Sequence, residues 1–231
     1  MTTARQIPLP LPHTTAMGAD DYMVTACNRE AAAWIEAWPQ WPAHGLIVTG
    51  GSGSGKSHLM HLWLHRSRGR AVTRADLTTR NAIDLTADDA PVAIDDADAL
   101  AGDAAGEEAL FHLYNRVKSS GRSMLLTMKT GAGQTPFQLP DLRSRLLTLP
   151  VAALAAPDDD LLAALIVKQF ADRQVALDAG VVSYLAARTA RDAAAIRDLV
   201  DRLDTAALAA GRKVSIALAR TLIEGQATEE R

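Results

Sequence analysis

The chain has 231 residues, of which 48% are hydrophobic and 4% aromatic, and a formal net charge of −3 at pH 7. This length and composition predict a soluble globular protein with one large domain or two modest ones. The charge excludes a global basic field that would draw the chain onto nucleic acid, so we expect little or no direct DNA binding. The only cysteine, Cys27, excludes an internal disulfide and fits a reducing cytoplasm.

The first 17 residues contain three prolines separated by apolar residues, which predicts an extended, flexible arm in place of a helix. This start has no apolar core of the kind found in signal peptides. No apolar run in the chain approaches the ~20 residues that a membrane-spanning helix requires. We therefore expect a cytoplasmic protein that does not associate with membranes.

The arm also contains Gln6, Leu9 and Leu11 in a Gln-x-x-Leu-x-Leu pattern. The pattern resembles the peptide by which many bacterial proteins dock on the replication sliding clamp. In that peptide a glutamine hydrogen-bonds at the rim of a pocket and two leucines fill it, an extended-peptide mode of recognition. By itself the pattern is more typical of a Pro-rich tail without a partner.

From residue 20 onward, strand patterns alternate with helix patterns. We predict a short strand at 22–24 and core strands at 45–49, 71–73, 91–94, 123–127 and 146–149. We predict helices at 28–38, with Asn28 as the N-terminal cap, and at 56–66, 77–85 and 107–119. This alternation indicates the α/β class, with a mostly parallel five-stranded sheet covered by helices on both faces. Ligands of such sheets bind at the carboxyl ends of the strands.

The segment from Gly50 to Ser57 fills every fixed position of a P-loop, the phosphate-binding turn between a strand and a helix. Glycines let successive backbone N–H groups point at phosphate oxygens, and the positive end of the following helix adds to the attraction. Lys56 would reach the β- and γ-phosphates, and the Ser57 hydroxyl would ligate Mg²⁺. The pattern predicts a nucleoside triphosphate or its diphosphate product with Mg²⁺, which the family resemblance given below narrows to ATP or ADP; the alternative is a glycine-rich hairpin that ends in Lys-Ser. The predicted nucleotide-binding residues of the loop are Gly50, Gly51, Ser52, Gly53, Ser54, Gly55, Lys56, Ser57 and His58.

Two acidic residues follow the predicted strand at 91–94. Asp95 would hold Mg²⁺ through its water shell, and Asp96 would polarise the attacking water. The alternative is that both are ordinary polar residues leaving a strand. Many ATPases that hydrolyse efficiently carry a glutamate at the second position, so the shorter Asp96 predicts weak intrinsic hydrolysis.

After Pro157 no strand pattern remains. Helices are predicted at 158–173, 178–188, 192–211 and 215–224, each opened by an Asp or Ser cap. The predicted organisation is an arm at 1–19, an α/β nucleotide-binding domain at 20–154, a small all-helical lid domain at 155–226 and a tail at 227–231.

The order of these motifs resembles that of the AAA+ ATPases and, within them, the DnaA initiator family. The resemblance covers about residues 20 to 223 and depends on several motifs in combination. The segments that carry it are Asn28 before the first strand, GGSGSGKSHL at 50–59, IDDADAL at 94–100, LRSRL at 142–146 and AIRDLVDRL at 195–203.

The resemblance implies roles for two arginines. Arg145 matches the arginine finger, which reaches a nucleotide on a neighbouring subunit and stabilises charge on its γ-phosphate. The alternatives are that Arg143 takes part, or that both arginines are solvated. Arg197 matches the lid arginine that touches the bound nucleotide; the alternative is a surface ion pair with Asp201. The family's polar sensor falls at Thr127, where the sequence departs from the usual pattern.

We expect the chain to lack the two DNA-contacting parts of the initiators, a long charged helical insertion and a helix-turn-helix domain. A DnaA-like motor without them, and with a clamp-type peptide, is similar to the Hda family (HdaA in some bacteria). That resemblance implies a regulator that docks on the DNA-loaded clamp and presents its finger to ATP-bound DnaA, whose ATP is then hydrolysed. The alternatives are an autonomous helicase-loader-like ATPase acting on DNA and a small-molecule kinase, and each is compatible with a homo-oligomer.

Overall fold

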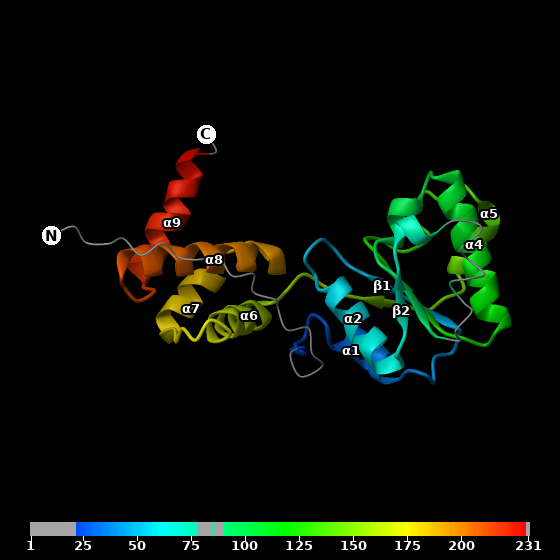
Figure 1. Ribbon diagram of the computed structural model, residues 1–231, viewed down its shortest axis with the longest axis horizontal. Helices are drawn as coiled ribbons and strands as arrows, with labels where there is room; N and C mark the ends of the chain where they lie inside the picture. The colour runs from blue at the N-terminus through cyan, green and yellow to red at the C-terminus, as the bar shows by residue number, and fades with distance from the viewer. Residues whose placement is uncertain (1–21, 78–84, 86–89, 230–231) are drawn as a thin grey trace. The chain divides into compact units, whose positions relative to one another are not determined.

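The computed structural model describes residues 22–77, 85 and 90–229, with side chains as far as Glu224 (Figure 1). The chain forms two compact units and passes from one to the other between Ala156 and Pro157. We call the described residues up to Ala156 the sheet unit and those from Pro157 onward the helical unit.

The sheet unit contains five parallel strands in the order β2-β3-β4-β1-β5, which confirms the predicted sheet. The carboxyl ends of β1, β3 and β4 lie at one edge, because Val48 of β1 pairs with Thr127 of β4 and Ile94 of β3 pairs with Leu126. The strands are β1 (Gly45–Thr49), β2 (Arg70–Val72), β3 (Val92–Ile94), β4 (Met124–Met128) and β5 (Val151–Ala153).

Helices cover both faces of the sheet, because successive strand residues alternate between the faces. Leu46 and Val48 pack with α1 (Arg29–Glu36) and α2 (Lys56–Ser67). Ile47 packs on the other face with α4 (Ala104–Ser119) and α5 (Pro140–Leu146). Two short 3₁₀ helices, η2 (Arg74–Asp76) and η3 (Ala97–Leu100), follow β2 and β3. This alternation of buried faces explains why β1 reads as a continuous apolar run.

The predicted fifth strand at 146–149 is wrong. Helix α5 extends to Leu146, and strand β5 begins only at Val151. Leu142, Leu146 and Leu149 all pack in the core shared with α4, because residues three and four apart share a helix face. The chain rejoins the sheet at Pro150, whose carbonyl accepts a hydrogen bond from Ile47 N at 3.0 Å. The apolar spacing that suggested a strand belongs to the end of a helix and the turn after it.

Two further predictions fail at the start of the sheet unit. Residues 22–24 form no strand in the structure. Asn28 stands before α1 but makes no capping hydrogen bond from its side chain. Instead its Nδ2 donates to Met23 O at 2.8 Å, and its Oδ1 accepts from Thr25 N at 2.8 Å, so it closes the loop before the helix. The predicted helix at 77–85 falls largely outside the described residues.

The helical unit consists, in its described residues, of α6 (Asp159–Ala171), α7 (Ala179–Ala186), α8 (Ala193–Ala210) and α9 (Ile216–Glu229). Asp158 and Asp192 cap α6 and α8, as predicted, by accepting backbone N–H bonds in the first turn. The core of this unit includes Phe170, Leu185 and Leu203. Nowhere in the described part of the chain is a helix both long and apolar enough to cross a membrane.

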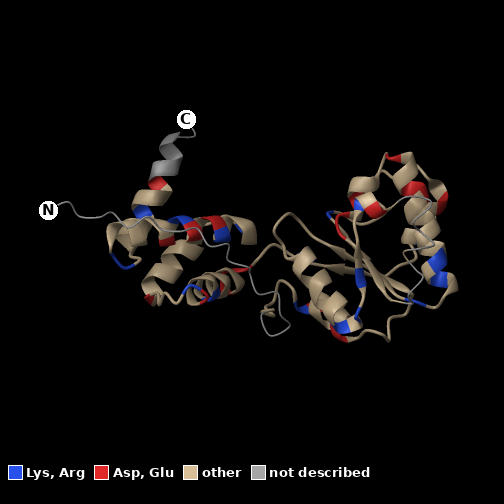
Figure 2. Ribbon diagram, viewed as in Figure 1, with Lys and Arg blue, Asp and Glu red and all other residues tan. Residues whose placement is uncertain are grey.

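The charges of the sheet unit are segregated (Figure 2). Helices that connect parallel strands run opposite to them, so α2 and α4 end at the edge away from the P-loop. Their last turns carry Arg66, Arg116 and Lys118, where cations complement the negative helix ends. Acidic residues gather instead around η3 and the start of α4. The small net charge of the sequence therefore says nothing of the uneven charge within the sheet unit.

Candidate functional site

The P-loop lies between β1 and α2 and is anchored to the neighbouring strands. Gly50 N donates to Met128 O at 3.2 Å, and Leu154 N donates to Thr49 O at 2.7 Å. The loop therefore leaves the sheet at the carboxyl edge, flanked by β4 on one side and by the end of β5 on the other. This is the edge at which parallel sheets bind ligands.

Two glycines of the loop are required for different reasons. A Cβ on Gly50 would lie 2.5 Å from Ser54 Oγ and 2.9 Å from the backbone oxygen of Leu154, so the space admits only glycine. Gly55, immediately before α2, has φ 97°, a left-handed conformation that other L-residues rarely adopt. Close approach at one end and backbone conformation at the other give the loop its curvature.

Lys56 is buried at the start of α2, with 7% of the residue exposed. Its Nζ donates to the carbonyls of Gly50 and Gly51, both at 2.9 Å, so the ammonium group lies across the loop. Ser54 Oγ is also buried and finds no hydrogen-bond partner among the described residues. The first N–H groups of α2 have no intrahelical acceptor. The Ser54 hydroxyl, the first N–H groups of α2 and the Lys56 ammonium group are together suited to bind a phosphate chain.

Two oxygen-bearing side chains suit Mg²⁺ beside this loop. Ser57 in the first turn of α2 and Asp95 after β3 are both exposed and offer the ligand atoms that Mg²⁺ prefers. Across the described residues no group of three or more His, Cys, Asp or Glu side chains could hold a metal ion. The residues present therefore fit Mg²⁺ that takes its remaining ligands from phosphate and water.

Thr127 connects the two acidic residues after β3. Its hydroxyl donates a hydrogen bond to Asp95 Oδ1 and accepts one from Asp96 N at 2.8 Å. Asp96 has φ 49°, a left-handed conformation that aspartate tolerates better than most residues. The sequence named Thr127 only through a family resemblance, and its one local signal is a polar residue within the apolar strand β4.

Arg145 lies in α5, on the face of the sheet opposite α2. Its guanidinium carbon is 5.3 Å from the ring centroid of Phe111 and 5.8 Å from that of Tyr114, so the cation stacks on aromatic side chains of α4. It is half-buried in this position. Arg143 is exposed, and its guanidinium donates to Gly133 O at 3.1 Å. The two arginines of the motif therefore have different surroundings.

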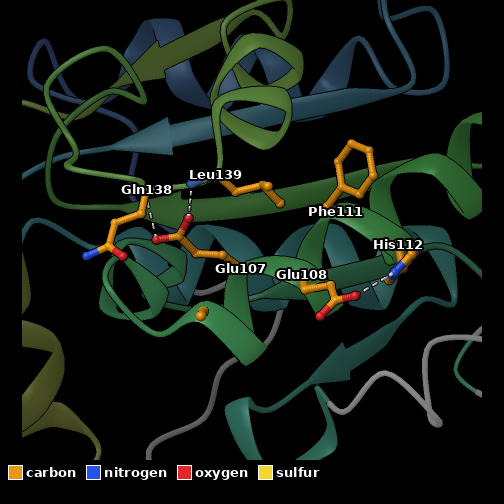
Figure 3. A pocket seen from close by; sticks show the side chains of 7 residues that line it. Glu107, Glu108, Phe111, His112, Gln138 and Leu139 are labelled. Atoms are coloured by element: carbon orange, nitrogen blue, oxygen red, sulfur yellow. Dashed lines mark hydrogen bonds and ion pairs between the residues drawn. The ribbon is translucent and has the colours of Figure 1, made fainter.

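A pocket of about 400 Å³ lies beside Phe111, between α4 and the chain that enters α5 (Figure 3). We call Arg145 and this pocket together the α4–α5 surface. Exposed Glu108 and His112, 3.5 Å apart, stand on the α4 side. The lining residues are Ala104, Glu107, Glu108, Phe111, His112, Gln138 and Leu139.

Glu107 supports this surface from within, with only 1% of the residue exposed. Its carboxylate points toward the 138–139 segment in Figure 3 and accepts backbone N–H bonds from Gly102 at 2.7 Å, Gln138 at 3.0 Å and Leu139 at 2.7 Å. Burial by itself would raise the pKa of Glu107, but the three N–H donors outweigh it and the pKa is lowered. The ionised side chain therefore fixes the chain just before α5.

Arg197 is exposed on α8 in the helical unit. The alternative ion pair with Asp201 is not formed, because Asp201 pairs with Arg173. Arg173, whose side chain is 7% exposed, also approaches Asp204 at 3.9 Å. The clamp-binding candidates Gln6, Leu9 and Leu11 lie outside the described residues.

The C-terminal part of the chain matches a known family. Residues 158–223 match the family model described as "Hda, lid domain". The matched segment contains α6, α7, α8 and the first part of α9.

Solved structures of similar fold cover both units. Domain III of DnaA from Thermotoga maritima superposes with a TM-score of 0.75 at 20% identity, over 92% of this chain and 97% of that one. DnaA from Aquifex aeolicus bound to AMPPCP matches with a TM-score of 0.67 at 16% identity, over 80% of this chain and 64% of that one. The RuvB Holliday junction branch migration motor of T. maritima matches with a TM-score of 0.71 at 16% identity, over 90% of this chain and 72% of that one. At identities this low, the structural similarity establishes a shared fold and nothing further.

Proposed function

Because the chain is a DnaA-like AAA+ protein whose C-terminal unit is related to the Hda lid domain, we propose that it regulates DnaA. In this proposal it binds a nucleotide of its own, docks on the replication sliding clamp, and supplies an arginine that promotes ATP hydrolysis by DnaA. Replication initiation is thereby limited. The position of Arg145, on the face of the sheet opposite its own α2, is the observation that carries the proposal.

The resident nucleotide is ADP or ATP with Mg²⁺, held by the P-loop. Support comes from the buried Lys56 ammonium, from the space that admits only glycine at position 50, and from the donors at the start of α2. The similar DnaA structure from A. aeolicus is bound to AMPPCP, a triphosphate analogue. In the helical unit, Arg197 has no ion pair among the described residues, which leaves its charge for the nucleotide phosphates.

Mg²⁺, when bound, neutralises charge on the phosphates. Ser57 and Asp95 would hold it, and Asp96 would orient water beside it. The side chain of Asp96 is shorter than that of glutamate by one methylene. Its backbone N–H donates to Thr127, and its own backbone conformation is left-handed. The chain's own hydrolysis is therefore weak, and its nucleotide serves mainly to hold the fold in place.

Arg145 acts on a nucleotide bound to DnaA. A guanidinium stabilises the charge that spreads over the γ-phosphate oxygens in the transition state. Stacking on Phe111 and Tyr114 restricts the side chain before it meets its target, so that less conformational freedom is lost on binding. The α4–α5 surface around it then faces the partner. The arm residues Gln6, Leu9 and Leu11 bring the chain to the clamp on DNA.

The test is DnaA–ATP turnover measured with clamp loaded on DNA, with the wild-type chain or with Arg145→Ala. We expect the stimulated rate to fall by on the order of 10³-fold, as when other arginine fingers are removed. Nucleotide binding and clamp binding should be unchanged. Arg143→Ala, two residues away on the same helix, is the matched control and should retain stimulation.

Unchanged stimulation by Arg145→Ala would remove the finger role. The same assay distinguishes the contribution of clamp binding from that of the arginine finger. Replacing Gln6, Leu9 and Leu11 by alanine should lower stimulation only because the chain no longer binds the clamp. Stimulation that persists in this variant, with clamp still retained in a pull-down, would remove the arm from the proposal.

A further inference from the structure

Thr127 is the polar side chain in an otherwise apolar strand, and it is fully buried. On one side it pairs with Val48 of β1. On the other side Leu126 pairs with Ile94 of β3, so the next residues along the two strands, Thr127 and Asp95, lie next to each other. Ile94 and Leu126 pack on the face of the sheet covered by α4. Because successive side chains of a strand point to opposite faces, Thr127 points to the face covered by α2, where Val48 also packs. The hydroxyl thus lies beneath the carboxyl edge on the P-loop side.

The single hydrogen-bond donor of this hydroxyl is already used. A threonine carries one O–H donor, and in Thr127 it is donated to Asp95 Oδ1. The oxygen accepts the N–H of Asp96 at 2.8 Å. A side chain that senses the γ-phosphate has to donate a hydrogen bond to a phosphate oxygen. Thr127 cannot do so while its only proton is bound to Asp95.

The bond to Asp96 N also has a conformational role. Asp96 has φ 49°, and the left-handed region costs an L-residue about 1–2 kcal/mol. The bond holds the peptide group between Asp95 and Asp96 in place, immediately before the residue that takes this conformation. One side chain therefore fixes the carboxylate of Asp95 and the peptide group that leads to Asp96.

We propose that Thr127 is a positioning residue for Asp95 and Asp96 and does not sense the γ-phosphate. The inference rests on the proposed nucleotide site and refines it. By holding one oxygen of Asp95, Thr127 leaves the other for the water shell of Mg²⁺. Nucleotide affinity then depends on Thr127 only through Mg²⁺, and to the same extent for a diphosphate and for a triphosphate.

The experiment compares the affinities of ADP and AMPPCP, by calorimetry, with Mg²⁺ and with EDTA, for the wild-type chain and Thr127→Val. Removing a group that orients a metal ligand costs about 10-fold or more in metal affinity. We therefore expect both nucleotides to bind about 10-fold more weakly in Mg²⁺ and with wild-type affinity in EDTA. A loss confined to AMPPCP would identify a phosphate sensor, and an equal loss with and without Mg²⁺ would identify a structural role; either result overturns the inference.

Two further variants separate this role from folding. Thr127→Ser keeps the hydroxyl and should restore Mg²⁺-dependent binding, even if Thr127→Val melts at a lower temperature. In an Asp95→Asn background, Thr127→Val should cause no additional loss of Mg²⁺-dependent affinity, because the group that it positions is gone. An additive loss would overturn the inference. Absence of nucleotide binding by the wild-type chain would instead overturn the proposed nucleotide site, and the inference with it.

Discussion

The P-loop and the α4–α5 surface belong to the same sheet unit but differ in how they are built. At the P-loop the Lys56 ammonium group lies on two backbone carbonyls beside the start of α2, whose first N–H groups have no intrahelical acceptor, and curvature comes from residues without side chains, such as Gly50. At the α4–α5 surface the group that we propose to act is a side chain, Arg145, supported by the aromatic ring of Phe111. The first site is a backbone turn crossed by a buried ammonium group, whereas the second is a half-buried guanidinium stacked on aromatic rings beside a pocket.

Under the proposed function, the difference shows how a site for the chain's own nucleotide is built unlike a site that acts on another molecule. Backbone donors keep their positions as long as the sheet is folded, which suits a ligand that stays bound. A stacked guanidinium can still move toward a partner's phosphate, because it is held by a stacking contact of roughly 0.5–2 kcal/mol. The two sites should therefore respond to different kinds of substitution.

After Arg145→Ala, the largest effect is expected at Gly50. In Gly50→Ala, the new Cβ would meet Leu154 O at 2.9 Å, so the backbone has to shift. Overpacking of this kind costs about 1–3 kcal/mol, and we expect nucleotide affinity to fall up to about 100-fold by calorimetry. Gly131→Ala, in the loop after β4, is the control, because nothing lies within 4 Å of its Cβ and it is not one of the predicted nucleotide-binding residues. Equal losses in the two variants would show that space at position 50 does not decide binding.

A smaller effect, on stability, is expected at Glu107. In Glu107→Gln, an NH₂ group would face one of three backbone N–H donors, which should lower the free energy of unfolding by about 2 kcal/mol. Denaturant unfolding measures it, with exposed Glu108→Gln as the control. Should both variants unfold alike, Glu107 would not be the support of the 138–139 segment.

The same comparison has a defined pH dependence. The pKa of Glu107 is lowered in the folded chain, so ionisation stabilises the fold above the unfolded glutamate pKa of about 4.3. That contribution is lost as the pH falls from about 4.3 through the lower folded pKa. The difference in stability between the wild-type chain and Glu107→Gln should therefore shrink with falling pH in this window.

The smallest effect is expected at the pocket of the α4–α5 surface. Ala104→Trp would fill the pocket without replacing Arg145 or Phe111. If this surface faces DnaA, the concentration of chain for half-maximal stimulation should rise about threefold to tenfold, for roughly 1 kcal/mol of lost contact. The maximal rate should stay the same. Ala105→Trp, equally exposed in the same turn but outside the pocket, is the control; a matching rise there would assign the effect to bulk on the helix.

The sequence by itself determined the elements whose rules are local. The P-loop follows from glycines, Lys56 and Ser57 at fixed spacing between a strand and a helix, and each of these requirements concerns neighbouring residues. The helix caps Asp158 and Asp192 were predictable for the same reason, since a cap bonds within one turn. The class of the fold followed from the alternation of two periodicities.

Only the tertiary structure decided which distant residues meet. Thr127 bonds to Asp95 across 32 residues, and Asp201 pairs with Arg173 across 28 instead of with Arg197 one turn away. The fifth strand was misplaced because the leucines before it satisfy both a strand and a helix end. Sequence spacing encodes which face of an element a residue occupies, but the neighbour on that face is chosen by the packing of strands and helices far apart in the chain.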